Sequence, residues 1–429
     1  MRLNSPMNET LINWAGNHTY RARRLRAPGT VEEIQELVAR HRNLKALGAR
    51  HSFNDIADSP GDLISLQNFN RVLSLDRERG AVTAEAGARY GDLCRYLHEA
   101  GYALHNLASL PHISVAGACA TATHGSGDTN GSLATAVSAL EMVIATGEIV
   151  SLSREKDGER FEGAIVALGG LGILTKLTLD ILPAFEMRQD VYQNLSLKEC
   201  EKRFDELTFS AYSVSLFTDW RGANFNQVWI KRRVTEDDSF KPPAELFGAT
   251  RAARALHPII SLSAENCTEQ MGIHGPWHER LPHFRMDFTP SSGEELQSEY
   301  ILPRQHALDA FHAIDKIHEQ VNPLLQISEI RTIAADRLWM SPCYRRDCVA
   351  VHFTWQKDWE AVKRLLPIIE ERLAPFEARP HWGKLFTTPP ARLKSLYPKL
   401  GDFQQLLRHY DPEGKFRNDF LNTYIFGEA

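Results

Sequence analysis

The chain has 429 residues, enough for two or three domains rather than one ordinary core. Hydrophobic residues make up 43% of it and charged residues 24%, proportions typical of a soluble globular protein and unlike those of a disordered one. The formal net charge of −5 gives no general attraction to nucleic acid or to a membrane surface, so the expected partner is a small or neutral molecule.

The first helix is predicted from a capping box. Thr30 is placed to accept a hydrogen bond from the backbone N–H of Glu33, and apolar residues at Val31, Ile34 and Val38 then recur on one helical face. A helix is therefore expected directly after residues 28–29.

A strand is predicted at residues 44–47, and it leads into the loop 48–54, which begins with a glycine and carries His51. A turn of this kind can place backbone N–H groups against a phosphate while it offers a ring nitrogen to a bound cofactor. Residues 82–86 predict another strand, and residues 90–100 predict a helix.

Small residues are concentrated in two stretches where the backbone can approach a ligand closely. Residues 109–131 are rich in glycine, alanine and threonine, and residues 169–172 contain three glycines. The alternation of residues 173–179 predicts a strand packed beside the same ligand.

The sequence changes in character after Pro183, where we expect a domain boundary. Strongly alternating segments then predict strands, and longer amphipathic segments predict helices that cover one face of an antiparallel sheet. The predicted strands are 212–220, 227–231, 283–289 and the segments around Ile330 and Val351, and the predicted helices are 306–321 and 359–373.

Two of these strands have informative parity. Glu329 and Arg331 share one face, and His352 and Thr354 share another face, opposite the apolar side chains of their strand. Taken alone, Glu329 and Arg331 could form an ordinary ion pair on the surface of a sheet, and His352 could be a sheet histidine whose hydrogen bonds are made within the fold. Their coincidence with Lys384 favours a site for a polyhydroxylated ligand.

Other chemistries have weaker signals. Residues 125–131 have the spacing G-x-G-x-x-x-G and follow no β-branched strand, so a Rossmann fingerprint is not supported. The 17 histidines show no zinc-ligand spacing, so no metal is expected, and no G-x-S-x-G elbow indicates a serine hydrolase.

The cysteines and the N-terminal segment predict a cytoplasmic setting. The six cysteines are scattered and form no C-x-x-C pair, as expected for reduced thiols. Residues 1–16 lack the apolar core of a secretion signal.

Six motifs in order resemble one family over residues 13–420. They are residues 48–54, 108–117, 121–127, 329–331, 352–355 and 381–384. The chain is similar to the bacterial alditol oxidases, FAD enzymes of the vanillyl-alcohol-oxidase type, and more distantly to the sugar-lactone oxidases.

The resemblance implies an α+β fold of two domains. An FAD-binding domain would comprise residues 1–184 plus 388–429, and a substrate-binding domain, an antiparallel sheet covered by helices, would comprise residues 185–387. His51 would hold FAD covalently. The residues implied to surround FAD are Gly48, Ala49, Arg50, His51, Ser52, Phe53, Asn54, Ser109, Ser114, Gly117, Thr121, Ala122, Thr123, His124, Ile173 and His381.

The implied reaction is oxidation of the terminal CH2OH of a polyol such as xylitol or sorbitol, with O2 reduced to H2O2, by a protein expected to be a monomer. Ser109, Glu329, Arg331, Thr354 and Lys384 would contact the polyol, and Arg331, Lys384, His352 and Glu329 would serve catalysis. Because a guanidinium stays protonated, the base is His352 or Lys384, and the sequence does not decide between them. A sugar-lactone oxidase or dehydrogenase remains the close alternative, and a flavin-binding protein without turnover remains a different one.

Overall fold

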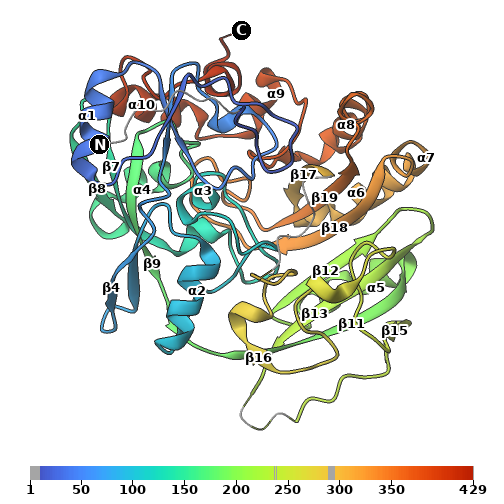
Figure 1. The fold of residues 1–429 in the computed structure, drawn as a ribbon. Coiled ribbons are helices and arrows are strands. Elements are labelled where there is room, and N and C mark those ends of the chain that lie inside the picture. The colour runs from blue at the N-terminus through green and yellow to red at the C-terminus, as the bar shows by residue number, and fades with distance from the viewer. Residues whose placement is uncertain (1–9, 236, 238, 288–294, 429) are drawn as a thin grey trace.

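The computed structural model describes residues 10–235, 237, 239–287 and 295–428. In Figure 1 residues 10–183 and the C-terminal helices lie together, and the segments between them build a large sheet beside that body. Within the described residues no helix combines the length and apolar character needed to cross a bilayer.

The first sheet positions the loop that carries His51. Its three strands are parallel, in the order β1 (Arg24–Arg26), β3 (Asp62–Ser65) and β2 (Leu44–Leu47). Strand β2 has the predicted bounds. It follows α1 (Val31–Arg40), where Thr30 Oγ1 accepts from Glu33 N at 3.2 Å as the capping box predicts.

A five-stranded sheet supports the small-residue segments. Its order is β4 (Val72–Asp76), β5 (Ala81–Glu85), β9 (Ile173–Asp180), β7 (Val137–Val143) and β8 (Ile149–Ser153). The helices of this part are α2 (Tyr90–Glu99), α3 (Val115–Ala120) and α4 (Arg154–Ile165). The helix predicted at 90–100 and the strand predicted at 173–179 are confirmed. A two-stranded sheet joins β6 (Tyr102–Ala103) to β10 (Leu182–Pro183), next to the expected boundary.

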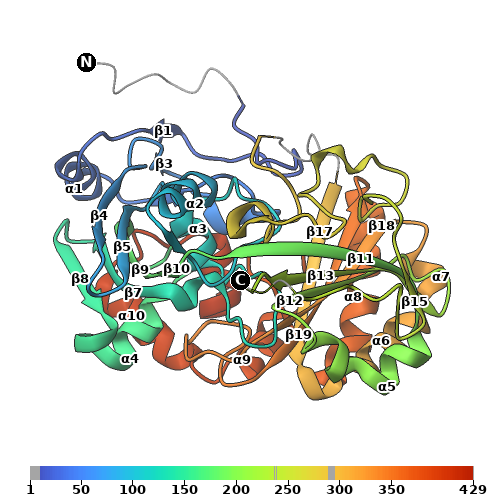
Figure 2. The same ribbon diagram turned by 90° about the horizontal axis from the view of Figure 1, so that it is seen from below.

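The large sheet has ten strands, and every pairing within it is antiparallel. Helices α5 (Leu197–Thr208), α6 (Ala307–Asp315) and α8 (Trp359–Leu373) lie along one side of it (Figure 2), which confirms the expected layer arrangement. Its main path runs β14 (Glu245–Leu246), β15 (Ala249–Arg251), β11 (Glu186–Ser196), β13 (Asn224–Arg233), β12 (Ser213–Thr218), β18 (Leu325–Ile333), β19 (Cys348–Gln356), β17 (Glu295–Pro303) and β20 (Arg379–Pro380), and β16 (Gly275–Pro276) pairs with β11.

Two predictions in this part are wrong. Residues 283–287 form no strand, and residues 288–289 lie outside the described part of the chain. The backbone N–H groups of His283 and Phe284 both point to the carbonyl of Ser109, so this segment is held against another loop instead of a strand. The helix predicted at 306–321 is divided, because α7 (His318–Val321) begins after a break at residues 316–317.

The C-terminal segment returns to the first part of the chain through α9 (Pro390–Leu396), α10 (Leu400–Tyr410) and α11 (Asp419–Leu421). Leu44 N donates to Lys415 O at 3.0 Å. The buried Lys45 ammonium donates to Leu168 O at 3.1 Å and to Phe416 O at 3.2 Å, so strand β2 is tied to the last segment of the chain.

Candidate active site

A cavity of about 1160 Å³ lies where the His51 loop faces the polar side of the ten-stranded sheet. This volume exceeds the range of roughly 300–1,000 Å³ that is usual for a small-ligand pocket, as expected for a dinucleotide together with a substrate. The predicted site residues that line it are Gly48, Ala49, Arg50, His51, Ser52, Phe53, Ser109, Ser114, Gly117, Thr121, Thr123, His124, Glu329, Arg331, His352, Thr354, His381 and Lys384.

Three residues predicted to bind the cofactor do not line this cavity. Ile173 is buried beneath it, and its neighbours Gly172 and Leu174 form the wall instead, because side chains alternate along β9. Ala122 is buried in a turn with φ +55°. Asn54 supports the site from behind, since its amide donates to the carbonyls of Trp382 and Lys384, each at 2.8 Å.

His51 is held by its own loop and by the N-terminal segment. Its Nδ1–H donates to Ala49 O at 2.9 Å, and its ring stacks on Trp14 with centroids 5.3 Å apart. Asn13 holds the same loop by donating to Ser52 O at 2.9 Å. Burial lowers the pKa of His51 to about 4, so the imidazole is neutral at pH 7 and keeps the lone pair that a nucleophile needs.

Glycines bring the backbone close to the cavity wall. A Cβ on Gly48 would meet Ser114 Oγ at 2.6 Å, and one on Gly172 would meet Val143 O at 2.5 Å. Side chains at these positions would intrude on packed neighbours, so the walls are made of backbone and small groups. Such walls suit the close approach of a dinucleotide, and the residues present therefore fit the expected FAD.

Glu329 and Arg331 form a buried ion pair on β18, with the predicted parity. Arg331 Nε donates to Glu329 Oε1 at 2.6 Å, and Arg331 Nη2 donates to Ser109 Oγ. Burial raises the pKa of Glu329, but the charge of Arg331 and the hydrogen bond from His283 outweigh it and hold the pKa well below its usual range. The pair therefore presents a fixed carboxylate beside a fixed cation.

A second buried carboxylate, Glu299 on β17, organises the other side of the cavity. In the sheet register His352 lies between Glu299 and Glu329 on neighbouring strands, so the three form one polar row. Lys384 Nζ lies 2.8 Å from Glu299 Oε2 and donates to His352 Nδ1 at 2.7 Å. An ammonium has no acceptor, so His352 carries its proton on Nε2 and donates it to Thr354 Oγ1 at 3.1 Å.

The two candidate bases differ in their environment. Burial, followed by the charge of Lys384, lowers the pKa of His352 to about 3, which makes its ring a weak base. Burial also lowers the pKa of Lys384, whereas Glu299 opposes that change. Of the two groups, His352 is therefore the weaker base.

Sequence reasoning missed Glu299 and His283, both of which line the cavity, and Lys231 behind them. The alternation of the strand Glu295–Pro303, which puts Glu295, Gln297 and Glu299 on one face, is a signal that could have identified Glu299. No pattern identifies His283, because its loop places it by backbone contacts.

The chain matches two family models and is similar to several known flavoenzymes and lactone-oxidising enzymes. The family model described as "FAD binding domain" matches residues 22–153, and "D-arabinono-1,4-lactone oxidase" matches residues 290–424. Alditol oxidase from a Streptomyces species is 50% identical over 98% of this chain and 100% of its own length. L-Gulono-1,4-lactone dehydrogenase from Mycobacterium tuberculosis is 28% identical over 98% of this chain and 100% of its own length. The crystal structure of cholesterol oxidase from B. sterolicum shares the fold, with a TM-score of 0.77 and 14% identity over 99% of this chain and 100% of that one.

Proposed function

The chain belongs to the family of vanillyl-alcohol-oxidase-type flavoproteins that contains alditol oxidase, and from this premise we propose that it is an FAD-dependent alditol oxidase that uses O2. The single observation that carries the proposal is the meeting, in one cavity, of the glycine-started His51 loop with the charged and hydroxyl groups of the large sheet. The more distant similarity to lactone-oxidising enzymes makes a lactone the substrate class to exclude.

FAD, when bound, would supply the hydride-accepting chemistry and the reactivity with O2 that yields H2O2. We propose that the neutral His51 forms the covalent link. Its stacking on Trp14 and its hydrogen bond to Ala49 support that role, because they hold the ring in one orientation.

The polar row of the sheet suits the recognition of a polyol. Glu329 accepts hydrogen bonds from substrate hydroxyls, while Ser109 and Thr354 each offer a hydroxyl of their own. A neutral hydrogen bond contributes only about 0.5–1.5 kcal/mol net, but an unpaired buried partner costs about 1–3 kcal/mol. We therefore expect strong discrimination against substrates that lack hydroxyls.

Proton transfer and charge stabilisation fall to the two cations. Lys384 in its neutral form accepts the proton of the reacting hydroxyl, since His352 is the weaker base and its Nδ1 is occupied. Arg331 remains charged and stabilises the oxygen as it loses its proton. Glu299 sets the balance between the two forms of Lys384.

An anaerobic titration of the purified protein against a polyol panel tests the function. Xylitol or sorbitol should bleach the flavin absorbance, gulonolactone should not, and admission of air should restore the colour and form peroxide. Bleaching by gulonolactone alone would favour a lactone oxidase. Bound FAD that no polyol bleaches would instead indicate a protein without turnover on this class.

We also propose the domain limits, the cellular setting and the oligomeric state. The contacts of residues 415–416 with β2 support an FAD-binding domain of residues 1–184 plus 388–429 around a substrate domain of 185–387. All six cysteines are free and buried, which supports a reducing compartment such as the cytoplasm. We expect a monomer, which light scattering of the purified protein would test.

A further inference from the structure

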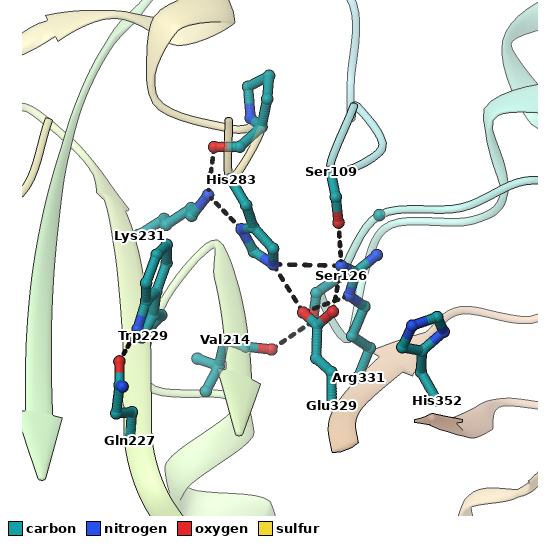
Figure 3. A network of polar contacts seen from close by, with 12 residues as sticks. Ser109, Ser126, Val214, Gln227, Trp229, Lys231, His283, Glu329, Arg331 and His352 are labelled. Atoms are coloured by element: carbon teal, nitrogen blue, oxygen red, sulfur yellow. Dashed lines mark hydrogen bonds and ion pairs between the residues drawn. The ribbon is translucent and has the colours of Figure 1, made fainter. Parts of the chain in front are cut away.

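Two buried titratable side chains lie behind Glu329 and have no part in the steps above. His283 reaches the cavity wall from the loop after residue 281, and Lys231 lies behind it on β13. Only 5% of His283 and 1% of Lys231 are exposed. Figure 3 shows them in one chain of contacts that ends at Glu329 and Arg331.

Lys231 holds the ring of His283 at Nδ1. Its ammonium donates to Leu281 O at 2.6 Å and to Pro282 O at 2.8 Å, and its third N–H faces His283 Nδ1 at 3.1 Å. The Glu329 carboxylate can only accept, and its Oε1 lies 2.7 Å from His283 Nε2, so Nδ1 is the unprotonated nitrogen of the neutral ring and accepts from Lys231. The proton of the neutral imidazole is therefore on Nε2.

His283 in turn fixes the direction of Glu329. Its Nε2–H donates to Glu329 Oε1 at 2.7 Å, and Arg331 donates to both oxygens of the same carboxylate. The carboxylate is thus held by N–H groups from two side chains. In the other tautomer the Nε2 lone pair would face Oε1 at the same short distance, and the carboxylate would lose this hydrogen bond.

We propose that Lys231 and His283 are positioning residues that set the specificity for a hydroxyl-rich substrate by holding Glu329 as an oriented acceptor. The inference rests on the proposed function, because it requires Glu329 to receive a substrate hydroxyl. Lys231 and His283 would influence substrate selectivity only through Glu329. Glu329 would recognise a substrate hydroxyl other than the one that is oxidised.

The test compares xylitol with its monodeoxy derivatives. In the wild type, kcat/KM should fall at least about tenfold for the derivative that lacks the hydroxyl facing Glu329, as the cost of an unpaired buried acceptor implies. In Lys231→Met and His283→Leu, kcat/KM for xylitol should fall to the level of that derivative, while the value for the derivative itself stays within about twofold. The loss should appear mainly in KM, because the reacting groups are unchanged.

Matched variants separate positioning from a general loss of structure. Ser328 precedes Glu329 on β18 and accepts a buried hydrogen bond from Trp220 Nε1. Ser328→Ala removes this bond and should leave the discrimination between xylitol and its deoxy derivatives intact. His283→Gln keeps an N–H that can reach Glu329 and should recover part of the discrimination, which also keeps the test decisive if His283→Leu fails to fold.

The outcomes are distinguishable. Discrimination equal to that of the wild type in Lys231→Met and His283→Leu, or an equal loss for xylitol and every deoxy derivative, would overturn this inference alone. A wild-type protein whose flavin no polyol reduces would overturn the proposed function and this inference together.

Discussion

Replacement of Glu299 by glutamine should move the pH dependence of substrate oxidation toward acid. Lys384 Nζ lies 2.8 Å from Glu299 Oε2, a contact worth ~6 kcal/mol by Coulomb's law at an effective dielectric constant of 20. The amide of glutamine retains a hydrogen bond worth ~1.5–3 kcal/mol to a charged group, so about 3–4 kcal/mol of support for the ammonium is lost. At ~1.4 kcal/mol for each pH unit, this loss lowers the pKa of Lys384 by about two to three pH units.

The sign follows from the role of Lys384 as proton acceptor. Burial already lowers its pKa and Glu299 opposes that effect, so removal of the carboxylate increases the neutral fraction at any given pH. If Lys384 accepts the proton, as proposed, the rate of flavin reduction should rise with pH as Lys384 loses its proton. In Glu299→Gln this rise should occur about two to three pH units lower. The limiting rate should fall by about tenfold or less, because the amine is a weaker base.

Anaerobic stopped-flow reduction of the holoenzyme by saturating xylitol, from about pH 6 to about pH 10, measures both quantities. Glu141→Gln is the matched control, since it removes a carboxylate that lies 2.7 Å from Lys176 at a partly exposed site away from the cavity. The control should have the wild-type profile. A midpoint in Glu299→Gln within about half a pH unit of wild type would refute the reasoning, and so would a shift toward alkali.

Three further predictions address the cofactor, the cation and stability. His51→Ala should lose the covalent link and keep the fold with FAD bound, so flavin should leave the acid-precipitated protein; yellow colour retained in the precipitate would contradict this. Arg331→Ala and Lys384→Ala should keep FAD while flavin reduction by xylitol slows by about 10²-fold or more, and near-wild-type rates in both would show that the pocket is misplaced. Burial lowers the pKa of His381 to about 3, so below about pH 6.5 the unfolded chain takes up a proton that the folded chain does not, and Tm should fall as pH decreases toward about 4. His381→Asn keeps an acceptor for the Gly383 N–H and should make that fall of Tm shallower, whereas an unchanged slope would contradict the assignment.

Local patterns predicted the elements that have strong local signals. The bounds of β2 and α8 agree with the prediction, because capping and apolar spacing determine where such elements start and stop. The parity of β18 and β19 correctly placed Glu329 with Arg331 and His352 with Thr354. A period of two is a local property and survives in any antiparallel sheet.

Non-local contacts account for what sequence reasoning missed. Residues 283–287 alternate like a strand but bind the carbonyls of Ser109 and Asn266 through their backbone, so the fold overrides their pattern. Glu299 becomes a site residue only because β17 pairs with β19 in the register that puts it opposite His352. The register between two strands more than 40 residues apart cannot be predicted from the sequence of either strand alone.

The hydrogen bond from Lys45 to the carbonyl of Phe416 bears on the order in which the domains fold during synthesis. Translation makes β2 and its His51 loop early, then the whole inserted sheet, and only afterwards the segment that completes the partners of β2. A nascent chain therefore cannot finish the walls around His51 while the ribosome is still producing the sheet. We therefore expect the packing that supports the His51 loop to be completed late in folding, after residues 415–416 have reached β2.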